Sequence, residues 1–165
     1  MKEIKINKVV ANIGVGESGE KLQKAEKLLQ DLTGQKPARG ISKATHPEFG
    51  VKKHAPIGTK VTLRKKIAVD FLKKAFEAIE NKVDRKKYDQ FGNLSFGIHE
   101  YIEMPGTQYD PDIGMFGMDV SVNLERAGYR IARRKKCQRK IPLSSRITKE
   151  EAMDFFKKNF GVETE

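Results

Sequence analysis

The stretch "MDVSVNLE", residues 118–125, is the pattern that most restricts how this chain can fold. Its apolar residues alternate strictly with polar ones, at Met118, Val120, Val122 and Leu124. In a β-strand, such alternation puts the apolar side chains on one face and the polar side chains on the other. Strands of this kind build a sheet with one buried and one exposed face, which is typical of antiparallel sheets. The pattern therefore predicts an α+β fold, with a mainly antiparallel sheet and helices packed on one face.

The remaining regular elements fit this arrangement. Strands are also predicted over residues 4–13, 60–64 and 93–100. Helices are predicted from Ser18 as N-cap to Gly34, over residues 66–82, and from a capping box of Thr148 and Glu151 to Gly161. Residues 1–165 contain no internal repeat or linker, so we expect a single domain.

Three long segments show neither period and are expected to be loops. The first is a structureless finger at residues 44–57, which contains imidazoles, lysines and one phenylalanine in "HPEFGVKKHAPI". The second, residues 101–117, is rich in Gly, Pro and Asp. The third is a basic insertion, residues 126–147, between the last long strand and the last helix.

Positive charge dominates the composition. The chain has 33 lysines and arginines against 22 acidic residues, a formal net charge of +11. Such an excess is typical of proteins that bind a polyanion, and nucleic acid is the expected partner. Eight cations fall within fifteen positions, at Arg126, Arg130, Arg133, Arg134, Lys135, Lys136, Arg139 and Lys140. We expect this run to contact phosphates, which gives affinity but little sequence selectivity.

Catalysis, metal binding and membrane insertion have little support in the sequence. His46, His54 and His99 have no cysteine or carboxylate at metal-ligand spacing beside them. Cys137 is the single cysteine, which fits a reducing cytosol and gives no local nucleophile–base pair. No run approaches the ~18 apolar residues of a membrane span. We expect a cytoplasmic protein that is not an enzyme, with no metal, cofactor, small-molecule substrate or membrane contact.

One motif favours a different class of function. "GVGESG", residues 14–19, matches G-x-G-x-x-G between a strand and a helix. Glu17 lies where a pyrophosphate would approach, and the further β-α units of a dinucleotide-binding fold are missing. A nucleotide-dependent enzyme is therefore the weakest alternative, although a glycine turn can bring the backbone close to a ligand.

Selective recognition of a folded RNA needs small polar side chains on a rigid surface. The candidates are Asn12 at the end of the first strand, Gln35 after the first helix and Thr62 on the strand at 60–64. Each of them can also be a turn or strand-surface residue without a role in binding.

Five motifs, in order along the chain, carry a resemblance to a known family: "NKVVANIGVGES" (7–18), "LTGQKP" (32–37), "APIGTKVTLR" (55–64), "NLSFGIHE" (93–100) and "FGMDV" (116–120). Over essentially its whole length, the chain resembles the universal L-five family of large-subunit ribosomal proteins, in its archaeal and eukaryotic form. The resemblance implies an antiparallel sheet with helices on one side. It also implies attachment of 5S rRNA to the large-subunit rRNA in the central protuberance, and contacts with P-site tRNA and a protein of the small-subunit head.

The resemblance further implies which residues bind. The family's rRNA contacts map onto Asn12 and Gly14 in "NIGVG", Gln35 and Lys36 in "TGQKP", and Lys60, Thr62 and Arg64 in "KVTLR". To these the charge argument adds Arg130, Arg133, Arg134, Lys135 and Lys136.

The finger corresponds to the family loop that reaches toward P-site tRNA, with His46, Phe49, Lys52, Lys53 and His54 as its predicted contacts. Residues 104–118 and the basic insertion are predicted to make the inter-subunit contact. The competing interpretation is a free-standing basic RNA-binding module without selectivity for 5S rRNA.

Overall fold

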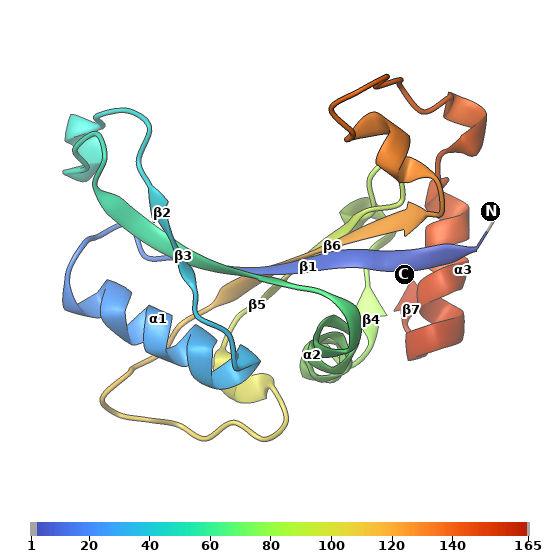
Figure 1. The fold of residues 1–165 in the computed structure, drawn as a ribbon. Coiled ribbons are helices and arrows are strands. Elements are labelled where there is room, and N and C mark those ends of the chain that lie inside the picture. Colours follow the sequence, from blue (N-terminus) through green and yellow to red (C-terminus); the bar gives the residue numbers. More distant parts are fainter. Residues whose placement is uncertain (1–2, 165) are drawn as a thin grey trace.

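The computed structural model describes residues 3–164, and a five-stranded antiparallel sheet forms its centre (Figure 1). The strands are β1 (Ile4–Gly14), β2 (Ala38–Ile41), β3 (Pro56–Leu63), β5 (Leu94–Ile98) and β6 (Met118–Arg126), in the order β2-β3-β1-β6-β5. A second, parallel pair joins β4 (Lys82–Val83) to β7 (Glu163–Thr164). The register of the sheet depends on β1, because β1 lies between β3 and β6.

Three α-helices complete the fold: α1 (Glu20–Thr33), α2 (Lys65–Ala78) and α3 (Lys149–Phe160). In Figure 1, α1 and α2 lie below the sheet and α3 stands at one end of it. The predicted α+β class, a mainly antiparallel sheet with helices on one face, is confirmed. Short 3-10 helices lie at Pro47–Phe49, Arg85–Lys87, Tyr101–Glu103, Tyr129–Ala132 and Leu143–Ser145. Within residues 3–164, no helix is long and apolar enough to cross a membrane.

The helix ends match the predictions only in part. The capping box of α3 is confirmed, because Thr148 Oγ1 accepts a hydrogen bond from the Glu151 N–H and the Glu151 carboxylate accepts one from the Thr148 N–H. The prediction of Ser18 as N-cap of α1 is wrong, since the helix starts after Gly19 and has no side-chain cap. Helix α2 ends at Ala78, four residues early, because the left-handed Glu80 and Asn81 turn the chain into β4.

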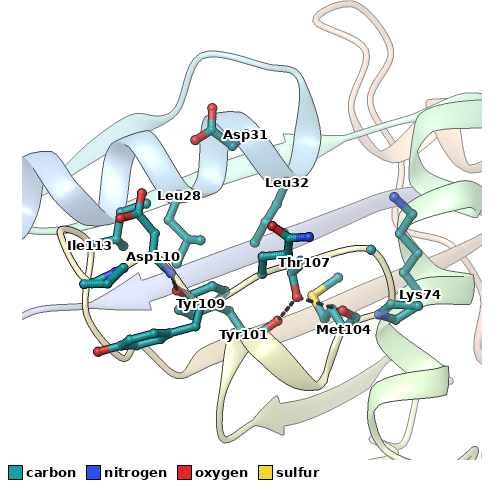
Figure 2. A pocket seen from close by; sticks show the side chains of 14 residues that line it. Leu28, Asp31, Leu32, Lys74, Tyr101, Met104, Thr107, Tyr109, Asp110 and Ile113 are labelled. Atoms are coloured by element: carbon teal, nitrogen blue, oxygen red, sulfur yellow. Dashed lines mark hydrogen bonds between the residues drawn. The ribbon is translucent and has the colours of Figure 1, made fainter.

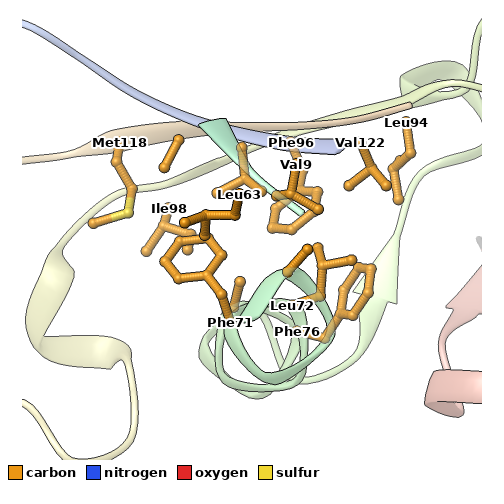
Figure 3. Packing of buried hydrophobic residues seen from close by; sticks show 14 of the residues in the cluster. Val9, Leu63, Phe71, Leu72, Phe76, Leu94, Phe96, Ile98, Met118 and Val122 are labelled. Carbon is orange, nitrogen blue, oxygen red and sulfur yellow. The ribbon is translucent and has the colours of Figure 1, made fainter. Parts of the chain in front are cut away.

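The core lies between the sheet and the helices (Figure 3). All four apolar residues of "MDVSVNLE" are buried, each at most 3% exposed, so the predicted alternation is confirmed. The Phe76 ring of α2 stacks on Phe96 of β5 at 5.2 Å between ring centroids, and Phe156 of α3 meets Phe76 edge-on at 5.8 Å. Each such side chain contributes roughly 1.5–3 kcal/mol by leaving water. This packing determines which face of the sheet is buried against the helices.

The region between α1 and β3 is more ordered than predicted. Strand β2 has four residues, too few to show a period, and β3 begins at Pro56 rather than Lys60. At the tip of the finger, His46 and Val51 form an antiparallel bridge with backbone hydrogen bonds of 2.8 and 3.1 Å. The finger is therefore a hairpin-like extension of β2 and β3, and the prediction of a structureless loop is wrong.

Candidate nucleic-acid interface

In Figure 1, α1 and α2 lie on one side of the sheet, and we call the opposite side the open face. The side chains that point to it are mostly polar. Its side chains alternate with buried ones along four strands: Lys8, Val10 and Asn12 of β1, Lys60 and Thr62 of β3, Ser95 of β5, and Asp119, Ser121 and Asn123 of β6. Because the backbone beneath them is held in the sheet ladder, these side chains stand on a stiff support.

Strand register brings three of the predicted rRNA residues together. Asn12 lies opposite Lys60 across β1 and β3, and Thr62 lies opposite Val10, two residues further along. Directly opposite residues in an antiparallel pair have Cβ atoms about 4.5–5.5 Å apart. Asn12, Lys60 and Thr62 thus place an amide, an ammonium and a hydroxyl in one small area.

Gly14 belongs to a row of three glycines at the foot of the finger, where Gly14, Gly58 and Gly40 lie side by side across β1, β3 and β2. A Cβ added to Gly58 would lie 3.0 Å from the Ile13 carbonyl oxygen, tighter than nearly all real Cβ contacts, so packing favours glycine there. A Cβ added to Gly14 would meet nothing within 4 Å. The backbone at Gly14 is therefore open to close approach.

Gln35 and Lys36 lie in the turn from α1 into β2, at the edge of the sheet. The Gln35 N–H donates to Thr33 Oγ1 at 3.3 Å, which fixes this turn. Two residues after Lys36, Ala38 lies opposite Lys60. The turn is thus next to the area that holds Asn12 and Lys60.

A chain of amides crosses the other side of the open face. Asn7 donates to Asn123 at 2.8 Å, Asn123 donates to Asn93 at 2.6 Å, and Asn93 donates to Asp89 at 2.6 Å. Alternation predicts the outward position of Asn123. It cannot reveal Asn7, because the register of β1 shifts between Ile6 and Lys8.

A hollow of about 430 Å³ lies between the end of β3, β1 and the basic insertion, and we call it the basic hollow. It brings together Arg64, Arg130 and Arg133 from the predicted rRNA set, and its other cations are Lys5, Lys65 and Arg126. Arg133 pairs with Glu125 at 2.7 Å. Lys5 pairs with Glu3 and Arg126 with Glu151, so three of the six cations are in ion pairs. Arg64, Lys65 and Arg130 keep the surface of the hollow net positive, which attracts phosphate.

The basic insertion is tied to the body of the protein at its neck. The Tyr129 hydroxyl donates to the Ser145 carbonyl oxygen and accepts from the Ile147 N–H, both at 3.1 Å. Arg126 pairs with Glu151 of α3 at 2.6 Å. The hydrogen bond from the Thr148 N–H, and to a lesser extent the guanidinium of Arg126, holds the pKa of the Glu151 carboxyl below its ordinary value of 4.5.

The tip of the insertion lies apart from the basic hollow and is exposed. It carries the remaining predicted phosphate contacts, Arg134, Lys135 and Lys136. Arg134 Nε donates to the Cys137 carbonyl oxygen at 2.9 Å, which curls the tip on itself.

The predicted tRNA contacts are all exposed, at His46, Phe49, Lys52, Lys53 and His54. Phe49 is 78% exposed, an unusual position for a large apolar ring. His54 has a left-handed backbone with φ 67°, and its N–H donates to the Ser42 carbonyl oxygen at 3.0 Å. In Figure 1, the finger and the basic insertion rise from the same side of the sheet, at its two ends.

A second hollow, of about 460 Å³, lies on the helix side between α1, α2 and residues 104–113 (Figure 2). Its loop is braced by Thr107, whose hydroxyl lies 2.7 Å from the Met104 carbonyl oxygen, and by Tyr101, whose hydroxyl accepts from the Asp110 N–H at 3.2 Å. The hollow is on the opposite side of the sheet from the predicted rRNA residues.

In the "GVGESG" turn, two backbone amides that could face a pyrophosphate are already used. The N–H groups of Val15 and Gly16 both donate to the Ile57 carbonyl oxygen, at 3.0 and 2.8 Å. Nucleotide binding at such turns depends on backbone N–H groups that point at the phosphates. Over residues 3–164, no three metal-ligating side chains come together in a cluster.

Comparison with known proteins gives a single family. Residues 1–52 match the family model described as ribosomal protein L5, and residues 56–159 match the model that describes the C-terminus of the same ribosomal family. A protein of Sulfurisphaera tokodaii is 53% identical over 163 residues, covering 98% of this chain and 92% of its own length. A protein of Methanoculleus marisnigri is 52% identical over 163 residues, covering 99% and 98%. Both relatives are named large ribosomal subunit protein uL5.

Proposed function

The chain belongs to the ribosomal protein L5 family, and from this premise we propose that it is a structural constituent of the large ribosomal subunit, in the cytoplasm, that binds 5S rRNA through the open face of its sheet. The proposal includes attachment of the 5S rRNA to large-subunit rRNA in the central protuberance. A protein with this role is a scaffold for RNA and not an enzyme.

The observation that carries this proposal is the grouping of Asn12, Lys60 and Thr62 on the open face. Amides and hydroxyls can bond to the 2′-hydroxyl groups and base edges of a folded RNA, whereas ammonium groups bond mainly to phosphates. Because the three side chains stand on paired strands, little ordering is needed when the RNA binds. We expect this area to supply selectivity.

The basic hollow supports a second part of the proposal. Arg64 and Arg130 approach each other there from distant parts of the chain, and the exposed tip adds further cations. Phosphate contacts of this kind add affinity that falls steeply with salt. We expect the basic hollow to hold the RNA backbone while the open face selects the RNA.

The finger and residues 104–118 complete the proposal. We assign the finger to P-site tRNA, with Lys52 and Lys53 for phosphate and Phe49 for stacking. We assign residues 104–118, with the basic insertion, to the small-subunit head. The assignment of the finger to tRNA is supported by its exposed Phe49 ring and its exposed lysines, which lie beyond the edge of the open face. Closing the hairpin between Ser42 and Ala55 with a short glycine turn should spare 5S rRNA affinity and impair tRNA positioning on assembled ribosomes.

Substitution on the open face tests the central claim. Asn12→Ala and Thr62→Ala should each weaken 5S rRNA binding by about 1–3 kcal/mol, since each leaves an RNA polar group without its partner. Gln23→Ala, on the exposed surface of α1, is the matched control and should bind like the parent. Binding is measured by titration with excess tRNA as competitor. Parent-like affinity in both variants would refute the assignment of 5S rRNA binding to the open face.

The free-standing basic module remains the alternative, because a net charge of +11 is itself sufficient for nonselective RNA binding. Such a module would lose orders of magnitude in affinity between about 50 and 200 mM salt and would be displaced by tRNA. The proposed function predicts a preference for 5S rRNA that persists at the higher salt.

A further inference from the structure

We propose that a small hollow beside Phe91, at the foot of the basic insertion, holds one unpaired base of the bound 5S rRNA. This inference rests on the proposed function and adds a specific subsite to it. The hollow is about 270 Å³ and lies at the end of the open face, where Asn93 and Asn123 form one wall. It is smaller than the ~300–1,000 Å³ typical of small-molecule sites, so it suits a flat ring rather than a whole ligand.

The position of Phe91 is not explained by the core. Its side chain is 43% exposed, while Phe76, Phe96 and Phe156 are buried together on the other side of the sheet. Hydrogen bonds from backbone N–H groups, and not packing of the ring, hold the turn that carries Phe91. Asp89 Oδ1 accepts from the Phe91 N–H at 2.8 Å and from the Asn93 N–H at 2.7 Å. The fold thus presents an aromatic ring on a rigid turn at the edge of a polar surface.

The groups around Phe91 match those that hold an unstacked base. The guanidinium carbon of Arg146 lies over the Phe91 ring, 4.6 Å from its centre, so Arg146 covers one face of the ring and a base would stack on the other face or on the guanidinium. Unpaired bases in RNA stack on such planes and hydrogen-bond through their edges. An aromatic ring alone is commoner as a packing residue, but this one stands beside amides and cations.

The amides of Asn93 and Asn123 have capacity left for the edge of a base. Each side-chain amide carries two N–H donors and a carbonyl oxygen with two lone pairs. In the amide chain, Asn123 uses one donor toward Asn93 and accepts one hydrogen bond from Asn7. Asn93 uses one donor toward Asp89. One donor and one acceptor position remain on each of the two amides.

The charges of the hollow select a nucleotide over other flat ligands. Lys140 and Arg146 line it and can meet the phosphates on either side of an extruded base. The single carboxylate in the wall, Glu125, is paired with Arg133 at 2.7 Å, so it does not repel a phosphate strongly. The hollow also adjoins the basic hollow, with which it shares Glu125 and Tyr129. The RNA backbone can follow these cations from one hollow to the next.

The test compares Phe91→Leu with Phe91→Tyr, using 5S rRNA as the probe. Phe91→Leu keeps an apolar side chain but removes the ring, and should weaken binding about 5- to 150-fold, the usual range for one base–aromatic stack. Its salt slope should equal the parent's, since no phosphate contact is lost. Phe91→Tyr keeps the ring and should bind within about twofold of the parent. Ultraviolet irradiation of the parent complex should also cross-link a nucleotide to Phe91, detected by peptide mass spectrometry.

Each outcome decides for or against the subsite. Parent-like binding by Phe91→Leu overturns it, because the ring then contributes nothing to RNA binding. Equal loss in Phe91→Leu and Phe91→Tyr also overturns it, because stacking cannot then be the cause. If Phe91→Leu is poorly folded by circular dichroism, the cross-link decides: its absence at Phe91 refutes the subsite. If the parent chain itself shows no preference for 5S rRNA over tRNA, the proposed function fails first and the inference falls with it.

Discussion

Replacing Gly58 by alanine tests whether close packing between β1 and β3 disfavours any side chain at this position, at the foot of the finger. The added Cβ would lie 3.0 Å from the Ile13 carbonyl oxygen and 3.7 Å from Gly14 Cα. These neighbours are backbone atoms of β1, which is held between β3 and β6 and cannot move without disturbing both pairings. A rotation of a flexible side chain therefore cannot relieve the contact.

We expect Gly58→Ala to lower the free energy of unfolding by about 1–3 kcal/mol, the usual cost of an added methyl group in a tightly packed place. For a chain of this size, each kcal/mol lowers Tm by about 2–4 °C. Gly14→Ala is the matched control, since its Cβ would meet nothing within 4 Å and its backbone is not left-handed. It should be neutral or stabilise by up to about 1 kcal/mol, through lower entropy of the unfolded chain.

Denaturant and thermal unfolding of the parent and the two variants, in the same buffer, measure these differences. A Gly58→Ala variant as stable as the parent would refute the packing argument. Equal destabilisation by Gly14→Ala would do the same, because it would show that any alanine in this row is costly whatever its surroundings.

Three further predictions concern charge and titration. Arg130→Gln should reduce the salt slope of RNA binding by about one unit, whereas Arg39→Gln, which breaks an ion pair with Glu26 on the helix side, should leave the slope unchanged. Glu151→Gln should remove the stability that the ionised Glu151 carboxylate contributes. Because the pKa of Glu151 is lowered in the folded protein, this contribution is complete above the ordinary carboxyl pKa and is lost as the pH falls through the folded-state pKa. The difference in stability between parent and variant should therefore vanish in acid. Burial raises the pKa of Tyr88 to about 12, so the parent should lose stability as the pH rises from 10 toward 12, and Tyr88→Phe should lose less over the same range. Unfolding measured against pH checks both titrations.

The sequence predicts those parts of the fold that depend on neighbours along the chain. The alternation at residues 118–125 correctly gives the buried face of β6, and the Thr148 capping box correctly gives the start of α3. Strand β2 escapes prediction, because four residues cannot show a period. Ser18 is a plausible cap by residue type, yet the chain uses Gly19 with φ 124°, a choice that depends on how β1 leads into α1.

The candidate site depends on contacts between distant segments, which periodicity cannot supply. That Asn12 lies opposite Lys60 follows from the register of β1 and β3, and Arg64 and Arg130 line one hollow only because the insertion folds back on the sheet. Phe91 has no sequence signal at all, since a lone aromatic residue in a turn is indistinguishable from a core residue. The roles of Asn12, Gln35 and Thr62 in binding remain predictions for the titrations above.

The two hydrogen bonds of the Tyr129 hydroxyl have a consequence for the thermodynamics of assembly. A dense run of cations would normally be an extended, self-repelling segment that must be ordered when it meets its partner. Here the run is closed at both ends, so much of its conformational freedom is already lost before any encounter. The segment should behave as a preorganised surface, with a small entropic penalty on association, although its composition alone would suggest a disordered insertion.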